Sequence, residues 1–372
     1  MSDRICIHQF APTVATGDGV THSAFYVQKL LRRLGYQSGI YSHRPPFELR
    51  DNVDDMHLFD DRSCHLLLVH HSMGHDLDQW LTRLRCPIIL VYHNITPPEY
   101  FPEGSGPYFF AKKGLSQLKA WADMCAGAIG VSELNTTALN DLGYKNVVTL
   151  PLLVDFDSLA GTAPRPPWAD VCATRSVLLS VGRLAPNKRQ DLLVDAMGYL
   201  LRLRPAGPRP LLFLAGNANE SFGETVRRRI RHWGLEKDVV ISGLIEDGHL
   251  RWLYQHSCLY WCASEHEGFC MPLIEAQYHR LPVVAFSSSN IPDTLGESGL
   301  IIDDPDPRLI AATTAHLLET ETERQTLQSS GDRNVRRYDE NTLLRQLKTY
   351  LQTFDHQVAA DRDRTGRYDE TR

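Results

Sequence analysis

The sequence predicts an α/β fold made of two doubly wound, Rossmann-like domains. Three observations support this prediction. The chain has 372 residues, which is more than a single hydrophobic core usually holds. Short apolar runs alternate with amphipathic stretches in both halves, a pattern typical of parallel sheets covered by helices. Residues 160–173 are rich in proline and alanine and are interpreted as a linker. We therefore expect one domain over residues 1–165 and a second over residues 166–336.

The composition is that of an ordinary soluble protein. Hydrophobic residues make up 42% of the chain and charged residues 23%, and the net charge of −6 provides no basic field for nucleic acid. No apolar run approaches the length of about 18 residues that a membrane-spanning helix needs. The N-terminus enters a strand without the apolar core of a signal peptide, so we expect a cytoplasmic protein.

The eight cysteines are scattered, and none forms a Cys-x2-Cys pair. Several lie in apolar, strand-like runs, which predicts reduced and buried thiols. Cys258, Cys262, His256 and His266 are near one another in the sequence, but a strand-like setting would splay their side chains apart. We therefore expect no metal site.

The N-terminal half begins in a β-loop-α-β order. We expect a strand at residues 4–10, a helix at 21–34 and a strand at 37–42. The first loop contains Gly17, Asp18 and Gly19 but not the Gly-x-Gly-x-x-Gly pattern, so it does not support a dinucleotide site. Two interpretations of this loop stay open: a plain strand-to-helix turn, or a glycine loop that lets a ligand approach the backbone.

Four further strands complete the predicted N-terminal sheet. They are expected at residues 64–70, 87–92, 128–132 and 147–150, with helices at 111–124 and 133–142. His93 directly follows the strand at 87–92. Ligands in open α/β sheets gather at the carboxyl ends of strands, which makes His93 a candidate site residue. A structural role for this histidine is an equally good interpretation.

The C-terminal half repeats the alternation of strands and helices. Strands are expected at residues 176–181, 211–215, 239–245, 258–263, 282–286 and 299–303, and helices at 188–203, 221–233, 309–319, 323–330 and 341–354. Asn187 is the expected N-cap of the helix at 188–203. The strand at 211–215 ends in Gly216 and Asn217.

The loop after the strand at 176–181 carries Arg183 and Lys188. A guanidinium offers a fork of hydrogen-bond donors and an ammonium offers a point charge, so together they could hold a diphosphate. Taken alone, two basic residues in a loop are more simply interpreted as exposed surface charges.

Two glutamates, Glu267 and Glu275, flank a predicted helix start. Pro272 suits the first helical turn, where its missing N–H is not needed. The free N–H groups of such a start form a site for an anion, and Gly268 would let a ligand come close to the backbone. Carboxylates on both sides could accept hydrogen bonds from sugar hydroxyls. This arrangement fits a nucleotide diphosphate-sugar.

Residues 264–276, followed by residues 281–285, resemble the donor site of retaining glycosyltransferases of family 4 (glycosyl transferases group 1), which have the GT-B fold. The string at 182–188 is similar to the phosphate clamp of that family, and the string Tyr-His-Asn-Ile-Thr-Pro-Pro at 92–98 looks like a subgroup of it. Cys270 stands where the family often has a glycine. The resemblance covers roughly residues 1–354 and is most specific over residues 176–303.

The resemblance implies two domains that face each other across a cleft. The N-terminal domain, residues 1–165, would bind the acceptor, and the C-terminal domain, residues 166–336, would bind the donor. The helix at 337–354 would cross back to the N-terminal domain. Residues 355–372 are polar and charge-mixed, and we expect them to be disordered.

The resemblance also implies roles for individual residues. Glu267 would hold the hydroxyls of the donor sugar, and Glu275 would hold the nucleotide ribose. The implied catalytic set is Glu267, Arg183, Lys188 and His93. The implied donor-binding set is Glu275, Gly268, Phe269, Cys270, Met271, Pro272, Leu273, Gly216, Leu244 and Ile245. Gly17, Asp18 and Gly19 would form a glycine loop facing the cleft.

The implied function is transfer of a sugar, with retention, from a nucleotide diphosphate-sugar to a saccharide or lipid-linked acceptor. No metal and no cofactor would be required. The expected context is cell-surface polysaccharide or lipopolysaccharide synthesis. This context would imply peripheral association with the inner face of the membrane. The alternatives are a non-catalytic sugar-nucleotide-binding protein and a GT-B sugar-nucleotide epimerase. The arginine run at 227–231 is interpreted as a solvated helix face, with contact to an anionic lipid or acceptor as the second interpretation.

Overall fold

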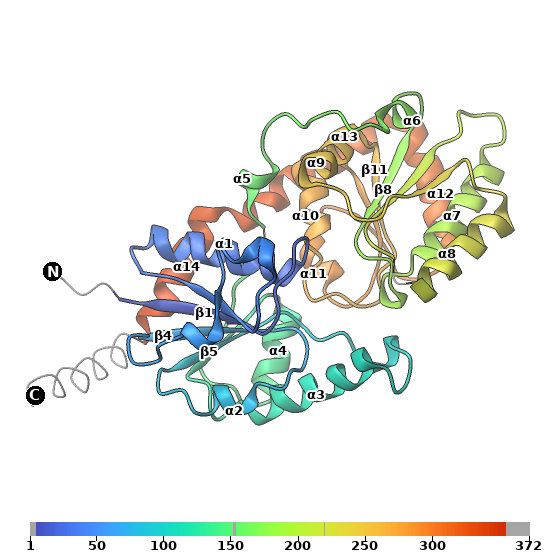
Figure 1. Cartoon of the computed structure of the whole chain (residues 1–372). Coiled ribbons are helices and arrows are strands. Elements are labelled where there is room, and N and C mark those ends of the chain that lie inside the picture. The colour runs from blue at the N-terminus through green and yellow to red at the C-terminus, as the bar shows by residue number, and fades with distance from the viewer. Residues whose placement is uncertain (1–4, 152–153, 219, 355–372) are drawn as a thin grey trace, which may run out of the picture. The chain divides into compact units, whose positions relative to one another are not determined.

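The computed structural model describes residues 5–151, 154–218 and 220–354, and these form two compact units (Figure 1). The first unit takes the described residues up to Val154 together with those from Asp339 onward. The second unit runs from Asp155 to Tyr338. The division therefore falls before the stretch at 160–173 that was interpreted as a linker. The tail at 355–372, expected to be disordered, lies outside the described residues.

The first unit is built on a parallel seven-stranded sheet with the order β3-β2-β1-β4-β5-β6-β7. Its strands are β1 (Ile7–Ala11), β2 (Ile40–Ser42), β3 (Asp54–Asp55), β4 (Leu66–His71), β5 (Ile88–Tyr92), β6 (Gly127–Gly130) and β7 (Val147–Thr149). Its helices are α1 (Gly19–Arg33), α2 (Asp78–Leu81), α3 (Gly106–Ala120), α4 (Glu133–Asp141) and α14 (Glu340–Gln352). Short 3₁₀ turns span Phe47–Leu49, Met56–Leu58 and Pro98–Tyr100. This strand order is the doubly wound arrangement that the sequence predicts.

Helices cover both faces of the first sheet. On one face, Phe10 and Leu67 pack with Leu118 of α3. On the other face, Ala11 packs with Ala24 of α1. Neighbouring residues of one strand point to opposite faces, so a strand buried on both faces reads as a continuous apolar run. That is why short apolar runs identified the other strands of this sheet but not β3, whose two residues are acidic and not buried.

The last described helix, α14, belongs to the first unit although it follows the second unit in the chain. The Tyr350 hydroxyl donates hydrogen bonds to the carbonyls of Ala128 (3.2 Å) and Asn146 (2.8 Å). The Lys29 ammonium of α1 lies 3.1 Å from the Glu340 carboxylate. These contacts attach α14 to β6, to the loop before β7 and to α1.

The second unit repeats the architecture with a six-stranded parallel sheet of order β10-β9-β8-β11-β12-β13. Its strands are β8 (Val177–Val181), β9 (Leu211–Ala215), β10 (Val239–Ile241), β11 (Leu259–Cys262), β12 (Val283–Phe286) and β13 (Leu300–Ile302). Its helices are α5 (Phe156–Leu159), α6 (Ala169–Ala173), α7 (Gln190–Leu203), α8 (Glu220–Trp233), α9 (Asp247–His256), α10 (Met271–Tyr278), α11 (Ile291–Leu295), α12 (Pro307–Glu319) and α13 (Glu321–Val335). Short 3₁₀ turns span Pro186–Lys188 and Arg336–Tyr338.

The core of the second unit has two layers, one on each face of its sheet. Trp261 of β11 points to the face covered by α7, α8 and α12, where it packs in one cluster with Leu193. Its neighbours Tyr260 and Cys262 point to the face covered by α9, α10 and α11, where they cluster with Leu273. The alternation along β11 therefore decides which residues approach α10.

Two local predictions were wrong in this unit, and one helix was not predicted. The stretch at 160–173 is not simply a linker, because it contains α6, and Ala169 and Cys172 are buried in the core. Asn187 does not cap a helix, because its side-chain amide donates to the His266 carbonyl and α7 begins only at Gln190. The helix α9 was not predicted, although its residues Trp252, Leu253 and Tyr254 are buried.

None of the described helices is long and apolar enough to cross a membrane.

Candidate functional site

Several of the candidate residues lie where the strand order of a sheet reverses. In the second unit the reversal falls between β8 and β11, which pair directly. Arg183 follows β8, and Glu267 follows β11. In the first unit the reversal falls between β1 and β4, and Gly17 follows β1. Crevices at such switch points are where ligands of doubly wound sheets bind.

Lys188 and Glu267 form an ion pair at the switch point of the second unit. The Lys188 ammonium lies 2.5 Å from Glu267 Oε1, and the Glu267 side chain is 8% exposed while that of Lys188 is 27% exposed. Burial works to lower the pKa of Lys188, but the Glu267 carboxylate, assisted by Cys270, outweighs it and the pKa is raised. Lys188 is therefore an ammonium at neutral pH.

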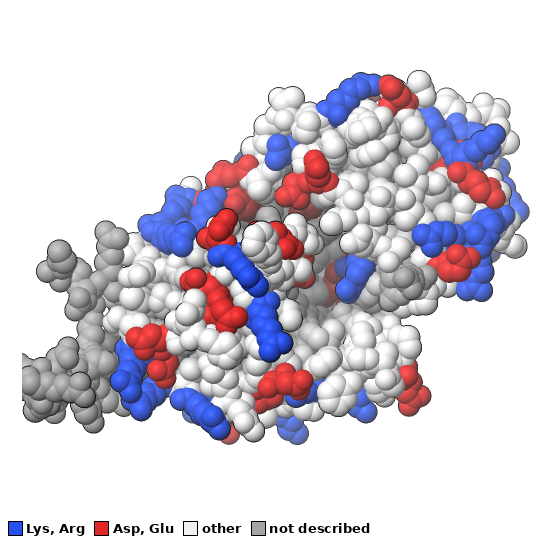
Figure 2. Space-filling model, viewed as in Figure 1, with Lys and Arg blue, Asp and Glu red and all other residues white. Residues whose placement is uncertain are grey.

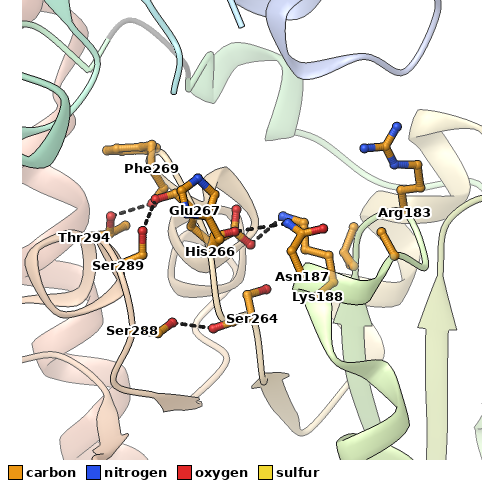
Figure 3. Close-up of polar contacts among 12 residues, drawn as sticks. Arg183, Asn187, Lys188, Ser264, His266, Glu267, Phe269, Ser288, Ser289 and Thr294 are labelled. Atoms are coloured by element: carbon orange, nitrogen blue, oxygen red, sulfur yellow. Dashed lines mark hydrogen bonds and ion pairs between the residues drawn. The ribbon is translucent and has the colours of Figure 1, made fainter. Parts of the chain in front are cut away.

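Short hydrogen bonds hold the loop that carries Glu267 in place (Figure 3). The Ser289 hydroxyl donates to the Glu267 carbonyl at 2.7 Å, and the Thr294 hydroxyl donates to the Phe269 carbonyl at 2.5 Å. On the other side, the Asn187 amide donates to the His266 carbonyl at 3.2 Å. The Glu267 loop is thus tied both to the loop after β12 and to the loop that carries Lys188.

Arg189, next to Lys188, adds a second connection between these loops. Its backbone is left-handed, with φ of 50°, and its guanidinium pairs with Glu265 and with Asp191 (3.1 Å). Two cation–carboxylate pairs, Lys188 with Glu267 and Arg189 with Glu265, therefore join the loop after β8 to the loop after β11. These two ion pairs were not predicted from the sequence, because the paired residues lie far apart in the chain.

The helix α10 starts directly after the Glu267 loop. Cys270 precedes it in a left-handed conformation with φ of 70°, and Pro272 lies in its first turn, as predicted. A left-handed backbone favours glycine, so the cysteine costs some strain at this position. Glu275 lies one turn into the helix, as the sequence predicted.

The other residues predicted around α10 differ in how far their side chains are buried. Phe269 and Leu273 have buried side chains, and the Leu273 N–H donates to the Cys270 carbonyl at 3.1 Å. Met271 and Pro272 are half-buried. Gly268 lies in the loop between Glu267 and α10.

Glu275 is oriented by a buried tyrosine. The Tyr254 hydroxyl of α9 donates to Glu275 Oε2 at 2.7 Å. Burial, followed by the nearby Glu275 carboxylate, raises the pKa of Tyr254 well above its usual value, so Tyr254 stays protonated as a donor. Tyr254 was not among the predicted site residues, because α9 itself was missed.

Arg183 has a different environment from Lys188. Its side chain is exposed and makes no hydrogen bond or ion pair within the described parts of the chain. Figure 3 shows it extending apart from the network around Glu267. Its guanidinium is therefore available to an anion.

The loops after β8, β9 and β10 are joined through their backbones. The Gly182 N–H donates to Ala215 at 2.9 Å, and the Gly216 N–H donates to Gly243 at 3.1 Å. Gly216 has φ of 148°, and a Cβ there would lie 2.2 Å from the Gly182 carbonyl oxygen. A side chain at Gly216 would therefore push against the loop that carries Arg183.

Leu244 and Ile245, predicted to contact a nucleotide base, lie in the loop after β10. The Leu244 side chain is 59% exposed, and its N–H is already engaged by the Asn217 side-chain oxygen at 3.0 Å. Ile245 packs on the core beside α9. An exposed apolar side chain beside strand ends is a surface on which a flat base can pack.

In the first unit, His93 belongs to a hydrogen-bonded chain. Its Nε2 lies 2.8 Å from His70 Nδ1, and His70 Nε2 lies 2.9 Å from the Gln9 side-chain oxygen. The Gln9 amide nitrogen donates to the Ala24 carbonyl at 3.0 Å, so its oxygen faces His70. A neutral His70 must then donate from Nε2 and accept at Nδ1. This assigns the Nε2–H tautomer to His93.

Burial keeps these histidines neutral. It lowers the pKa of His70 to about 3 and lowers that of His93 well below its usual value. His93 is half-buried, and its Nδ1 makes no hydrogen bond to any part of the chain that the structure describes. The arrangement gives His93 an accepting nitrogen directed away from the His70 contact.

The loop at 17–19 has an evident structural role. The Asp18 carboxylate accepts from the Thr21 N–H (2.9 Å) and hydroxyl (3.0 Å), so it caps α1. Gly17 has φ of 76° and needs to be glycine for the turn, whereas Gly19 is already the first residue of α1. The interpretation as a strand-to-helix turn therefore accounts for these three residues.

The arginine run at 227–231 lies on the exposed face of α8. Arg231 lies 2.5 Å from Glu224, and Arg229 lies 3.5 Å from Asp195. On the face seen in Figure 2, basic and acidic side chains are likewise interspersed. These pairs support the interpretation as a solvated helix face.

Comparison with known proteins extends this description. Residues 172–333 match the family model Glycosyl transferases group 1. The chain is 25% identical over 243 residues to O-antigen chain mannosyltransferase B of Escherichia coli, a match that covers 62% of this chain and 60% of that protein. It is 34% identical over 113 residues to mannosylfructose-phosphate synthase of Agrobacterium fabrum, covering 29% of this chain and 24% of that protein.

A solved structure supports the fold. HepE of Anabaena, in complex with UDP and glucose, matches with a TM-score of 0.74 at 16% identity, covering 94% of this chain and 100% of that one. The chain spans only 24% and 60% of the length of the two curated relatives named above. The second unit thus carries a glycosyl transferases group 1 domain at residues 172–333, and the chain has the two-domain GT-B fold.

Proposed function

We propose that the chain is a retaining glycosyltransferase that moves a sugar from a nucleotide diphosphate-sugar to a saccharide or lipid-linked acceptor. The observation that carries this proposal is the Lys188–Glu267 ion pair at the switch point of the second sheet, next to the start of α10. A donor of this class combines an anionic diphosphate with hydroxyl-rich sugars. The Lys188 ammonium, the start of α10 and the carboxylates of Glu267 and Glu275 are complementary to that combination.

The diphosphate is the group that must leave with negative charge. Arg183 and Lys188 would neutralise it, and the N–H groups at the start of α10 would add hydrogen bonds. The exposed Arg183 can turn toward a ligand without breaking an ion pair. Lys188 is held by Glu267, so the diphosphate would share this ammonium with the carboxylate rather than find it unpaired.

The two glutamates would bind different parts of the donor. Glu275, oriented by Tyr254, would accept hydrogen bonds from the ribose hydroxyls. Glu267 would accept hydrogen bonds from hydroxyls of the transferred sugar. Both carboxylates are committed to hydroxyl binding, so we favour attack by the acceptor on the face from which the diphosphate leaves, with the leaving phosphate taking the acceptor proton. That route retains the anomeric configuration without an enzyme nucleophile.

The proposed chemistry needs no metal ion, because the basic side chains and the helix start supply the positive charge at the diphosphate. His93 would act as a neutral hydrogen-bonding group and not as a general base. Its bare Nδ1 suits it to accept a hydrogen bond from a sugar hydroxyl.

The acceptor is proposed from the kind of relatives that the chain matches. One of them is an O-antigen chain mannosyltransferase. This relative supports a growing saccharide as the acceptor, in cell-surface polysaccharide or lipopolysaccharide synthesis. A lipid-linked acceptor would bring the protein to the inner face of the membrane.

A thermal-shift screen of nucleotide diphosphates and their sugars, with and without Mg²⁺, tests the proposal. A ligand at 100 times its dissociation constant adds about 2.7 kcal/mol of stability. We expect a shift by one nucleotide family, independent of Mg²⁺ and lost in Glu275→Ala. No shift with any nucleotide would reject the donor site.

Turnover separates an enzyme from a non-catalytic binder. The nucleotide that gives the shift is supplied as its sugar together with saccharide acceptors, and the product is examined by NMR. Formation of a new glycosidic bond with the donor's anomeric configuration supports a retaining transferase. Binding without transfer or hydrolysis would support the non-catalytic alternative, and an inverted product would reject retention.

A further inference from the structure

Three residues of the second unit bring soft and hard ligand atoms together. Cys262 Sγ, Cys270 Sγ and a carboxylate oxygen of Glu267 all lie within 4.8 Å of one another, and all three residues are buried. Cys262 ends β11, Cys270 precedes α10 and Glu267 lies in the loop between them. The cluster therefore depends on the turn that this loop makes.

The geometry points to a binding site for a thiophilic divalent cation such as Zn²⁺, formed by Cys262, Glu267 and Cys270. Zn²⁺ binds cysteine sulfur at about 2.3 Å and carboxylate oxygen at about 2.1 Å, which places two sulfurs of a tetrahedral site about 3.8 Å apart. The separations in the cluster are within reach of that arrangement after small side-chain rotations. Three ligands leave a fourth position open for water or a ligand oxygen.

The set of ligand atoms decides which cation would bind. Mg²⁺ and Ca²⁺ prefer sites made of oxygen atoms alone, whereas two sulfurs select Zn²⁺ and its softer analogue Cd²⁺. This site differs from the one considered from the sequence, which combined Cys262 with Cys258, His256 and His266. Only Cys262 is common to both.

Charge balance favours the same conclusion. Two thiolates and the Glu267 carboxylate carry three negative charges. A divalent cation and the Lys188 ammonium, 2.5 Å from Glu267, carry three positive charges. A buried cluster is stable only when its charges are compensated, and this one is neutral when the cation is bound. Without the cation, protonated thiols and the Lys188–Glu267 pair are neutral as well.

The site overlaps the groups that the proposed function assigns to the donor, and this consequence rests on that function. A bound cation would occupy Glu267 and Cys270, which the donor sugar and diphosphate need. We therefore infer that Zn²⁺ competes with the nucleotide-sugar and holds the enzyme inactive until the cation is removed.

Direct metal titration tests the site without any donor. The full chain is titrated with Cd²⁺ in buffer that contains a phosphine reductant to keep the thiols reduced. Binding is followed by the thiolate-to-cadmium charge-transfer absorption. We expect one tight site that is weakened by at least about 100-fold in Cys262→Ala and in Cys270→Ala, since each removes one of three ligands. Cys258→Ala, at the other end of β11, is the matched control and should bind as the wild type. Equal affinity in all four proteins would overturn the site.

Spectroscopy of the wild type tests the ligand set even if the cysteine variants fail to fold. X-ray absorption of the one-equivalent Zn²⁺ complex should show two sulfur neighbours at about 2.3 Å and lighter atoms in the remaining positions. A shell of nitrogen and oxygen alone would overturn the assignment. Circular dichroism of the metal-free variants checks that they are folded.

Competition with the donor is measured separately. The thermal shift caused by the nucleotide diphosphate should disappear with one equivalent of Zn²⁺ and return on addition of a chelator. Cys262→Ala, which removes a metal ligand that has no assigned role in donor binding, should keep its nucleotide shift in the presence of Zn²⁺. Metal binding at the cysteines with an unchanged nucleotide shift would overturn the competition. If no nucleotide binds at all, the proposed function fails while the cadmium titration still decides the metal site.

Discussion

The Lys188 ammonium and the Glu267 carboxylate lie 2.5 Å apart although 79 positions separate them in the chain. The pair joins the loop after β8 to the loop after β11, the two strands between which the sheet order reverses. Each charge compensates the other in a setting that is mostly shielded from water. Neither residue can be changed without altering the environment of its partner.

Substitution of the two basic residues should have different effects on stability. Lys188→Ala leaves Glu267 without its partner, so we expect both a lower melting temperature and transfer slowed by about 10²–10³-fold. Arg183→Ala should slow transfer by a similar factor but leave the melting temperature almost unchanged, because its exposed side chain makes no hydrogen bond or ion pair with the residues that the structure describes. Initial rates at saturating donor and thermal melts measure both effects.

The exposed Lys237→Ala is the control for this comparison. It removes a lysine from the same unit without touching the strand ends, so its rate and stability should match the wild type. Normal transfer by both Arg183→Ala and Lys188→Ala would remove these residues from the proposed site.

Tyr254→Phe should weaken donor binding without stopping transfer. The substitution keeps the buried ring but removes the hydroxyl that donates to Glu275 at 2.7 Å. A hydrogen bond to a charged group contributes about 1.5–3 kcal/mol, so the donor KM should rise by about 10-fold or more while kcat changes little. Glu275→Ala should raise KM further. The control is Tyr199→Phe, whose ring packs on Trp233 on the opposite side of the sheet.

A fall in kcat with an unchanged KM in Tyr254→Phe would contradict this account. It would mean that Tyr254 acts on the reacting groups rather than through the orientation of Glu275.

The tautomer of His93 is a direct consequence of the chain through His70 and Gln9. We expect nitrogen NMR of the wild type to show His93 protonated at Nε2 and bare at Nδ1. Gln9→Leu removes the oxygen that fixes His70, so His93 should then populate both tautomers. His71, whose Nε2 donates to the Gly114 carbonyl at 3.1 Å, should keep its tautomer in both proteins. A wild-type His93 protonated at Nδ1 would refute the assignment.

Buried histidines should make the first unit sensitive to acid. Burial lowers the pKa of His70 to about 3 and the pKa of His71 and His75 to about 4. The unfolded chain takes up these protons near pH 6.5, before the folded protein does. The stabilising contribution of the neutral histidines is therefore complete above about pH 6.5 and is lost as the pH falls toward 4.

Each of these histidines should remove about 2 kcal/mol of unfolding free energy between pH 6.5 and pH 5. Around His75 the carboxylate of Asp78 opposes the effect and the ammonium of Lys113 adds to it. Urea unfolding at both pH values, followed by hydrogen exchange in β4 and β5, measures the loss. In His71→Asn the unfolding free energy should change less steeply with pH, because about one proton fewer is taken up on unfolding. The exposed His22→Asn should follow the wild type. Equal pH dependence in all three proteins would contradict the prediction.

The fold and the site differ in how far the sequence predicts them. Apolar runs located the strands closely, and for β9 (Leu211–Ala215) the expected and observed limits coincide. These runs are local signals, because a strand buried on both faces needs apolar residues throughout. Arg183, Lys188 and Glu267 were predicted as site residues from local strings, and the structure pairs two of them, Lys188 and Glu267.

The partners of the site residues could not be predicted in the same way. That Lys188 meets Glu267, that Tyr254 meets Glu275 and that His70 meets His93 depends on which strands are neighbours and in what register. The Asn187 prediction failed for the same reason. Its local preference for capping is weaker than the contact with His266 that the tertiary fold offers.

Gly216 should be essential to the shape of the loops that carry the site. A Cβ at this position would lie 2.2 Å from the Gly182 carbonyl oxygen and 2.6 Å from its carbon, and both are backbone atoms that cannot rotate away. Gly216→Ala should therefore cost about 1–3 kcal/mol in unfolding free energy and move the loop before Arg183, which weakens nucleotide binding. Gly207→Ala is the matched control, because its new Cβ would meet only the Arg204 guanidinium at 3.5 Å or more. Urea midpoints and nucleotide titrations of the two variants test this, and a Gly216→Ala protein with wild-type stability and binding would show that the close approach of the two loops is not required.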